Sequence, residues 1–113
     1  MDLGAFLRPG AEAAVLMAPA ESGRGPAPGR VVRRKDRLRW LCSAPQPSGR
    51  ELTLTIDLPG YDLEADGSLR PARPPASATL ILLGQVRGCR FWPPEAVYVL
   101  RLSLLGRIWP RPQ

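Results

Sequence analysis

Carboxylates that could exchange a proton with a substrate occur together at one place, Asp62, Glu64 and Asp66. Paired acids can act as general acid and base, but only where the fold holds them in a fixed site. These three lie in the proline- and glycine-rich stretch 59–76, whose composition is typical of a solvated loop. We therefore predict an acidic surface loop here and no catalytic residues.

The residue types needed for most other chemistry are missing from the sequence. It has no histidine, and Cys42 and Cys89 are not spaced as a metal-binding pair. It contains no nucleophile elbow, P-loop or dinucleotide-binding fingerprint. We predict a protein that is not an enzyme, with no metal site and no cofactor of its own. Both cysteines are expected to be buried free thiols.

Arginine is the residue type that could bind a ligand. Of the 16 basic residues, six lie between positions 30 and 42, and the net charge of +6 favours anionic partners. The candidate anion-binding surface consists of Arg33, Arg34, Arg37 and Arg39. The same pattern also fits the solvated face of a small β-domain, so the sequence leaves both interpretations open.

Trp40 bears on what these arginines could bind. Single-stranded nucleic acid is bound where an aromatic face lies beside positive charge. Trp40 falls on the same side of a period-two pattern as Leu38 and Cys42, so we expect it in the core. The arginines would then meet phosphate without a stacking partner. A small basic OB-like or SH3-like barrel that binds nucleic acid is nevertheless kept as the alternative function.

A pair of strands joined by a tight turn at Lys35-Asp36 must position these arginines. Gly84 indicates a bulge or a central position within a later strand. Residues 12–18 fit either a short strand or one or two helical turns. The segments predicted to form strands are 30–34, 37–42, 51–58, 78–86 and 96–105, and in 78–86 the apolar residues lie on both faces up to Gly84.

The 14 prolines and 11 glycines disfavour long helices. Five or six short strands without βαβ spacing predict an all-β fold, a small antiparallel five- to six-stranded barrel with little helix. We expect one domain over residues 1–108, with a long flap or loop at 59–76 and a linker-like tail at 109–113. Phe91 and Trp92 flank a proline-rich turn and could be exposed.

No stretch approaches the roughly 18 apolar residues that a membrane-spanning helix needs. The N-terminal apolar run is interrupted by Arg8, Pro9 and Glu12, which is unlike a signal peptide. The sequence therefore predicts a cytoplasmic protein with no membrane span.

The order of these features resembles the N-terminal split-barrel domain of YcgR-like flagellar brake proteins, which precedes a PilZ domain. Two departures from the family's pattern are the length of 59–76 and Leu105, which stands where the family has a proline. The segments that carry the resemblance are Leu7–Gly10 with Ala14–Met17, Gly29–Arg34 with Asp36, Leu38 and Trp40, Gly49–Ile56, Ala78–Val86 and Tyr98–Ile108.

The resemblance implies a non-enzymatic regulatory module that acts through protein contacts, with a PilZ domain or flagellar motor components as partners. It implies cyclic di-GMP as a ligand bound with the partner PilZ domain. Because the family's nucleotide lies at the junction of the two domains, Arg107 and Arg111 are the candidate nucleotide contacts. The sequence stops at Gln113, where a PilZ domain begins in the family, which implies an excised module or a stand-alone relative.

Overall fold

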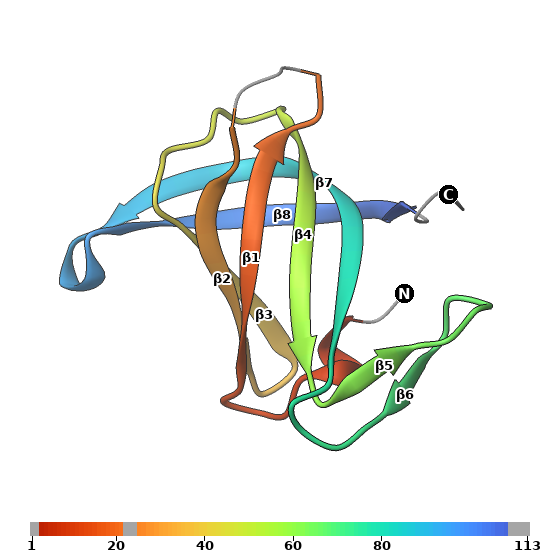
Figure 1. Cartoon of the computed structure of the whole chain (residues 1–113). Helices are drawn as coiled ribbons and strands as arrows, with labels where there is room; N and C mark the ends of the chain where they lie inside the picture. Colours follow the sequence, from red (N-terminus) through yellow and green to blue (C-terminus); the bar gives the residue numbers. More distant parts are fainter. Residues whose placement is uncertain (1–2, 22–24, 109–113) are drawn as a thin grey trace.

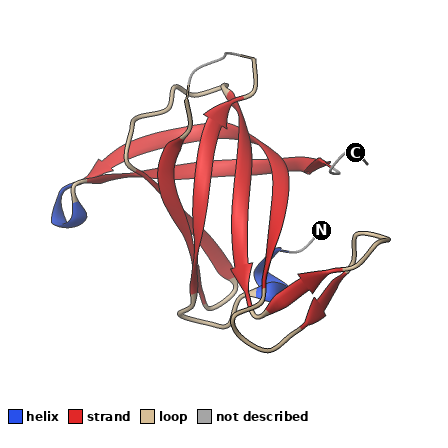
Figure 2. Ribbon diagram, viewed as in Figure 1, coloured by secondary structure: helices blue, strands red, loops and turns tan. Residues whose placement is uncertain are grey.

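The structure is a computed structural model that describes residues 3–21 and 25–108 (Figure 1). Most of these residues belong to strands, and in several of the strands buried and exposed side chains alternate. Figure 2 shows that strands predominate and that little of the described chain is helical. The helical segments are the 3-10 turns η1 (Leu3–Phe6) and η2 (Pro93–Glu95). The strands are β1 (Glu12–Pro19), β2 (Ala27–Arg34), β3 (Arg37–Cys42), β4 (Glu51–Pro59), β5 (Tyr61–Leu63), β6 (Leu69–Pro71), β7 (Ser77–Trp92) and β8 (Val97–Ile108).

Six strands close into an antiparallel barrel in the order β1-β2-β3-β8-β7-β4. The predicted all-β class and six-stranded antiparallel barrel are therefore confirmed. The strand β4 shows the underlying pattern most clearly, because its leucine and isoleucine side chains alternate with polar ones and are fully buried. Those side chains are Leu52, Leu54, Ile56 and Leu58.

The predicted hairpin of arginine-rich strands is present. Lys35 and Asp36 form its turn, and Arg34 pairs with Arg37 as the last pair before it. Lys35 has a φ of 55°, the left-handed conformation that a tight turn requires. The strand β2 begins at Ala27, three residues before the predicted start at Arg30.

Residues 12–18, for which strand and helix were both open, belong to β1. Ala13, Val15 and Met17 point into the core, and the residues between them face outward. Leu3 and Leu7 from the N-terminal segment join the same core cluster. The N-terminal segment therefore packs onto the barrel.

The last two barrel strands are longer than predicted. The strand expected over 78–86 runs from Ser77 to Trp92, and the one expected over 96–105 runs from Val97 to Ile108. The irregularity predicted at Gly84 is present as a shift of register between Leu83 and Gly84, and a second shift lies between Val86 and Gly88. In Figure 1 the β7–β8 pair continues beyond the other strands as a ribbon that ends at η2.

The segment 59–76, expected to be a long flap or loop, contains a two-stranded sheet of its own, β5 and β6. The ring of Tyr61 in β5 packs edge-on against Phe6, with centroids 5.5 Å apart. This contact connects the β5–β6 hairpin to the N-terminal segment.

The core prediction for Trp40 is confirmed, since only 3% of it is exposed. The prediction of two buried free thiols is half right. Cys42 and Cys89 are both free, but Cys89 is exposed because it lies where β7 has left its pairing with β4. The tail 109–113, including Trp109, lies outside the described residues.

Gly29 offers a test of how tightly the barrel wall is packed. A Cβ at this position would collide with the backbone carbonyl of Leu41 and lie 3.0 Å from the Cε of Met17. Because backbone cannot rotate away, Gly29→Ala should lower the free energy of unfolding by about 1–3 kcal/mol. Urea unfolding followed by tryptophan fluorescence measures this. The control is Gly106→Ala, where nothing lies within 4 Å of the added Cβ. Equal midpoints for the two variants would contradict the packing argument.

Candidate anion-binding site

Three of the predicted arginines come together on the outer face of the barrel. Arg34, Arg37 and Arg39 line a hollow of about 450 Å³. Its other wall is formed by Val99, Leu100 and Arg101. The hollow exists because β3 and β8 pair only through Trp40–Leu100, Leu41–Val99 and Cys42–Tyr98, before the two strands separate.

Arg33, which was predicted to join this surface, is used differently. Its Nε donates to the carbonyl oxygen of Lys35 at 2.8 Å, and its Nη1 donates to the carbonyl oxygen of Leu7 at 2.6 Å. Its guanidinium therefore connects the β2–β3 turn to the N-terminal segment. Its contribution is to local structure, and it does not line the hollow.

An aromatic partner for the arginines comes from β7. The Cζ of Arg39 lies 4.7 Å from the centroid of the Trp92 ring, and the Cζ of Arg90 lies 5.5 Å from it. These are cation–π distances. Trp40 is buried as predicted, so the stacking partner that seemed to be missing is Trp92, from a strand more than fifty residues away.

Arg101 reaches the same region across the backbone of β7. A Cβ at Gly88 would lie 2.8 Å from its Nη2 and 2.9 Å from its Nε, so the guanidinium occupies the place that a side chain would fill. The Nη2 also contacts the carbonyl oxygen of Arg87 at 3.5 Å. A second hollow of about 270 Å³ is lined here by Gly88, Cys89, Arg90, Val99 and Arg101.

We call this surface the arginine groove, and define it by Arg37, Arg39, Arg90, Trp92 and Arg101. The two hollows share Val99 and Arg101 and are therefore adjacent. One signal in the sequence could have identified Arg101, because alternation in the last strand places it opposite the side of Leu100 and Leu102. No signal in the sequence would bring Arg90 and Trp92 to the same surface.

An ion pair holds the tip of the β7–β8 ribbon to the barrel. Arg30 in β2 donates from Nη2 to Glu95 Oε1 in η2 at 2.5 Å, and its Nε lies 3.6 Å from Glu12 Oε2. Arg30 lies opposite Leu41, which in turn lies opposite Val99, so it is on the same outer face as the groove. This pair helps to keep Trp92 over Arg39.

Positive charge predominates in the arginine groove. Ion pairs within the described part of the chain involve Arg30 and Arg70, and none of them engages a groove arginine. Asp36 is a carboxylate at one end of the first hollow. An anion can therefore approach these guanidinium groups without displacing a carboxylate.

The two arginines implied by the family resemblance lie elsewhere or cannot be placed. Arg107, near the end of β8, donates from Nη1 to the carbonyl oxygen of Gly67 in the β5–β6 turn. Arg111 lies outside the described residues. Arg107 thus belongs to the region of the acidic hairpin and is not part of the arginine groove.

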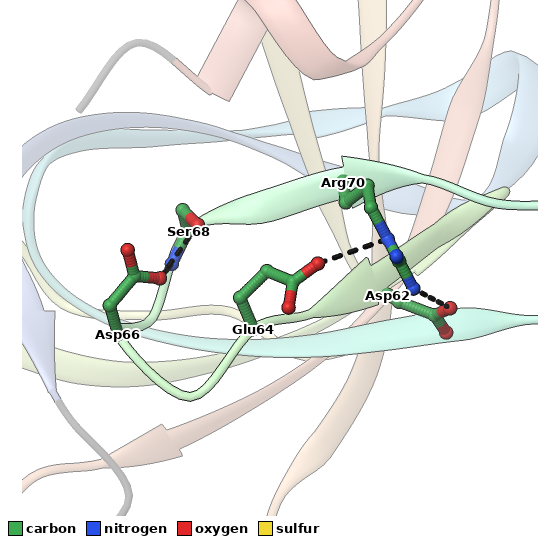
Figure 3. A network of polar contacts seen from close by, with 5 residues as sticks. All are labelled: Asp62, Glu64, Asp66, Ser68 and Arg70. Carbon is green, nitrogen blue, oxygen red and sulfur yellow. Dashed lines mark hydrogen bonds and ion pairs between the residues drawn. The ribbon is translucent and has the colours of Figure 1, made fainter.

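The predicted acidic loop is a hydrogen-bonded hairpin (Figure 3). Arg70 contacts Glu64 through Nε at 3.0 Å and Asp62 through Nη2 at 3.5 Å. Asp66 accepts hydrogen bonds from the Oγ of Ser68 at 2.7 Å and from its backbone N–H at 2.9 Å. These carboxylates are committed to the turn and to Arg70, which fits their interpretation as surface residues.

Two further findings concern the part of the chain that is described. No three histidine, cysteine, aspartate or glutamate side chains within it are grouped so that they could hold a metal ion. None of its helices is long and apolar enough to cross a membrane.

No family model, curated protein or solved structure matches this chain.

Asp66 provides a test of the hairpin turn. The hydroxyl of Ser68, followed by its backbone N–H, lowers the pKa of the Asp66 carboxyl below its usual 3.8. Its contribution to stability is therefore present at neutral pH and is lost as the pH falls through this lowered pKa. Ser68→Ala should raise the pKa of Asp66 toward 3.8, as measured by NMR titration of the carboxyl carbon.

The control for this titration is Ser48→Ala, which removes a hydroxyl that contacts the carbonyl oxygen of Arg87 instead. Asp66 should titrate in this variant as it does in the unchanged protein. An Asp66 pKa that does not respond to Ser68→Ala would contradict the hydrogen-bonded turn.

Proposed function

We propose that this chain is a non-enzymatic regulatory module that acts in the cytoplasm through contacts with a PilZ domain sensing cyclic di-GMP. The observation that carries the proposal is a group of exposed apolar side chains near the end of the last strand. Leu104, Leu105 and Ile108 are 38%, 48% and 40% exposed. The three side chains lie within residues 104–108 of one strand, and exposed apolar side chains of this kind can pack against another protein.

The architecture supports the same proposal. Along the chain, β1, the β2–β3 pair, β4 and the long strands β7 and β8 are the features on which the resemblance to flagellar brake proteins rests, and β8 pairs with both β3 and β7. A PilZ domain following β8 would be attached directly to this wall of the barrel. Its position would then be sensitive to any ligand that binds between the two domains.

Arg107 suggests how a nucleotide could change that position. Its guanidinium contacts the carbonyl oxygen of Gly67, on the hairpin of β5 and β6. A phosphate is a stronger partner for guanidinium than a neutral carbonyl. Cyclic di-GMP near Arg107 and Arg111 would compete for this contact and shift the population between two arrangements of the neighbouring domain. The switch would need no catalytic residue.

The test compares this chain with a version extended into the sequence encoded after residue 113. Cyclic di-GMP is titrated into each by isothermal calorimetry. The extended protein should bind at least about tenfold more tightly, because each 1.4 kcal/mol contributed by the second domain changes the dissociation constant tenfold. Arg107→Gln in the extended protein should weaken binding, while Arg73→Gln, an exposed arginine of the hairpin region, should not.

Equal affinity for the short and extended chains would refute the junction site. An extension with no nucleotide-binding domain would refute the coupling itself. The apolar surface has a separate readout, because Leu105→Lys should loosen the contact between the domains and increase proteolysis of the connecting residues without changing the fold of the barrel.

A further inference from the structure

Guanidinium groups from three strands converge in the arginine groove, although they are far apart in the sequence. Arg39 comes from β3, Arg90 from β7 and Arg101 from β8. Two of them lie over the ring of Trp92, and the third lies over the backbone at Gly88. Each head group is thus supported by a contact that uses no carboxylate. Arginines that served only to make the surface soluble in water would not need to be held by an aromatic ring or by the backbone.

A guanidinium that lies over an indole ring keeps the N–H donors at its edge available. These donors match the oxygens of a phosphate in a two-point contact, which a lysine ammonium cannot reproduce. Arg39 and Arg90 share one ring, so their donors lie on the same surface. The groove is therefore suited to several neighbouring phosphates.

The dimensions and lining of the groove restrict the ligand further. Hollows of about 450 and 270 Å³ are of the size that holds one or two nucleotide-sized groups. Leu38 and Val99 give the larger hollow an apolar part beside the charges. Bases stack on guanidinium and aromatic planes and pack against such surfaces, whereas an acidic peptide offers no planar group to use them. A duplex would reach only the rim.

We infer that the arginine groove binds single-stranded nucleic acid, with the phosphodiester backbone on Arg39, Arg90 and Arg101 and the bases against Trp92 and the apolar wall. This site is separate from the region of Arg107 and does not depend on a PilZ partner. The binding requires no metal ion and no covalent step.

Gly88→Ala is the sharpest variant, because it changes the site while retaining every charge. The added Cβ must displace the guanidinium of Arg101, which is the flexible end of a side chain, so the fold should tolerate it. The matched control is Gly106→Ala on the neighbouring strand, where the Cβ meets nothing within 4 Å. Fluorescence anisotropy of a labelled oligo-dT with the full chain gives the dissociation constant. Gly88→Ala should raise it several-fold, and Gly106→Ala should leave it unchanged.

Three further variants separate stacking and geometry from charge. Trp92→Leu should weaken binding by about tenfold, in the range found for base–aromatic stacking. Arg39→Lys should also weaken it, although the charge is kept. Arg101→Gln should reduce the slope of log affinity against log salt by about 0.7, as expected for one phosphate contact to a single strand. Arg73→Gln is the charge control, and circular dichroism verifies that each variant is folded.

Two outcomes would overturn the inference. If inorganic polyphosphate competes as well as oligo-dT, and Trp92→Leu and Gly88→Ala bind like the unchanged protein, the groove is only a source of diffuse positive charge. If poly-glutamate binds more tightly than oligo-dT, the partner is an acidic protein segment. Preference for oligo-dT over the same sequence in a duplex, together with the loss in Gly88→Ala, supports the site as described.

Discussion

A short ladder between β3 and β8 closes the barrel, and the placement of every candidate residue depends on it. It consists of the pairs Trp40–Leu100, Leu41–Val99 and Cys42–Tyr98. Trp40, Cys42 and Leu100 in this ladder are buried, so the hydrophobic core fixes the register of two strands that are sixty residues apart. A shift by one residue would exchange the core and outer faces of β8, and Arg101 would leave the groove.

The β7–β8 ribbon closes the core and also extends it with a polar surface. The first half of β7 pairs with β4 and is mostly apolar. The second half no longer pairs with β4 and carries Arg87, Arg90 and Trp92. The shift of register near Gly88 separates these halves and leaves room for the guanidinium of Arg101. Arg30 and Glu95 hold the ribbon's tip to the barrel. One irregular strand therefore connects the packing of the core with the geometry of the groove.

The two ends of β8 have different chemistry. The beginning of the strand and its partner β7 carry the basic groove, whereas its end carries exposed apolar side chains and Arg107 beside the acidic hairpin. The regulatory contact that we propose and the nucleic-acid site that we infer therefore lie at opposite ends of this strand. The strand β8 runs through both regions.

Local alternation in the sequence determined the all-β class, the arginine hairpin with its turn, the core position of Trp40 and the irregularity at Gly84, because these depend on neighbours within a few residues. It did not determine the ends of β7 and β8, because Arg87, Gly88 and Arg90 interrupt the apolar pattern while cross-strand pairing continues. Nor could it place Trp92 beside Arg39, direct Arg33 to the N-terminal segment or expose Cys89. These features follow from barrel closure and long-range register, which are set by burial of the whole core, so only the tertiary structure decided them.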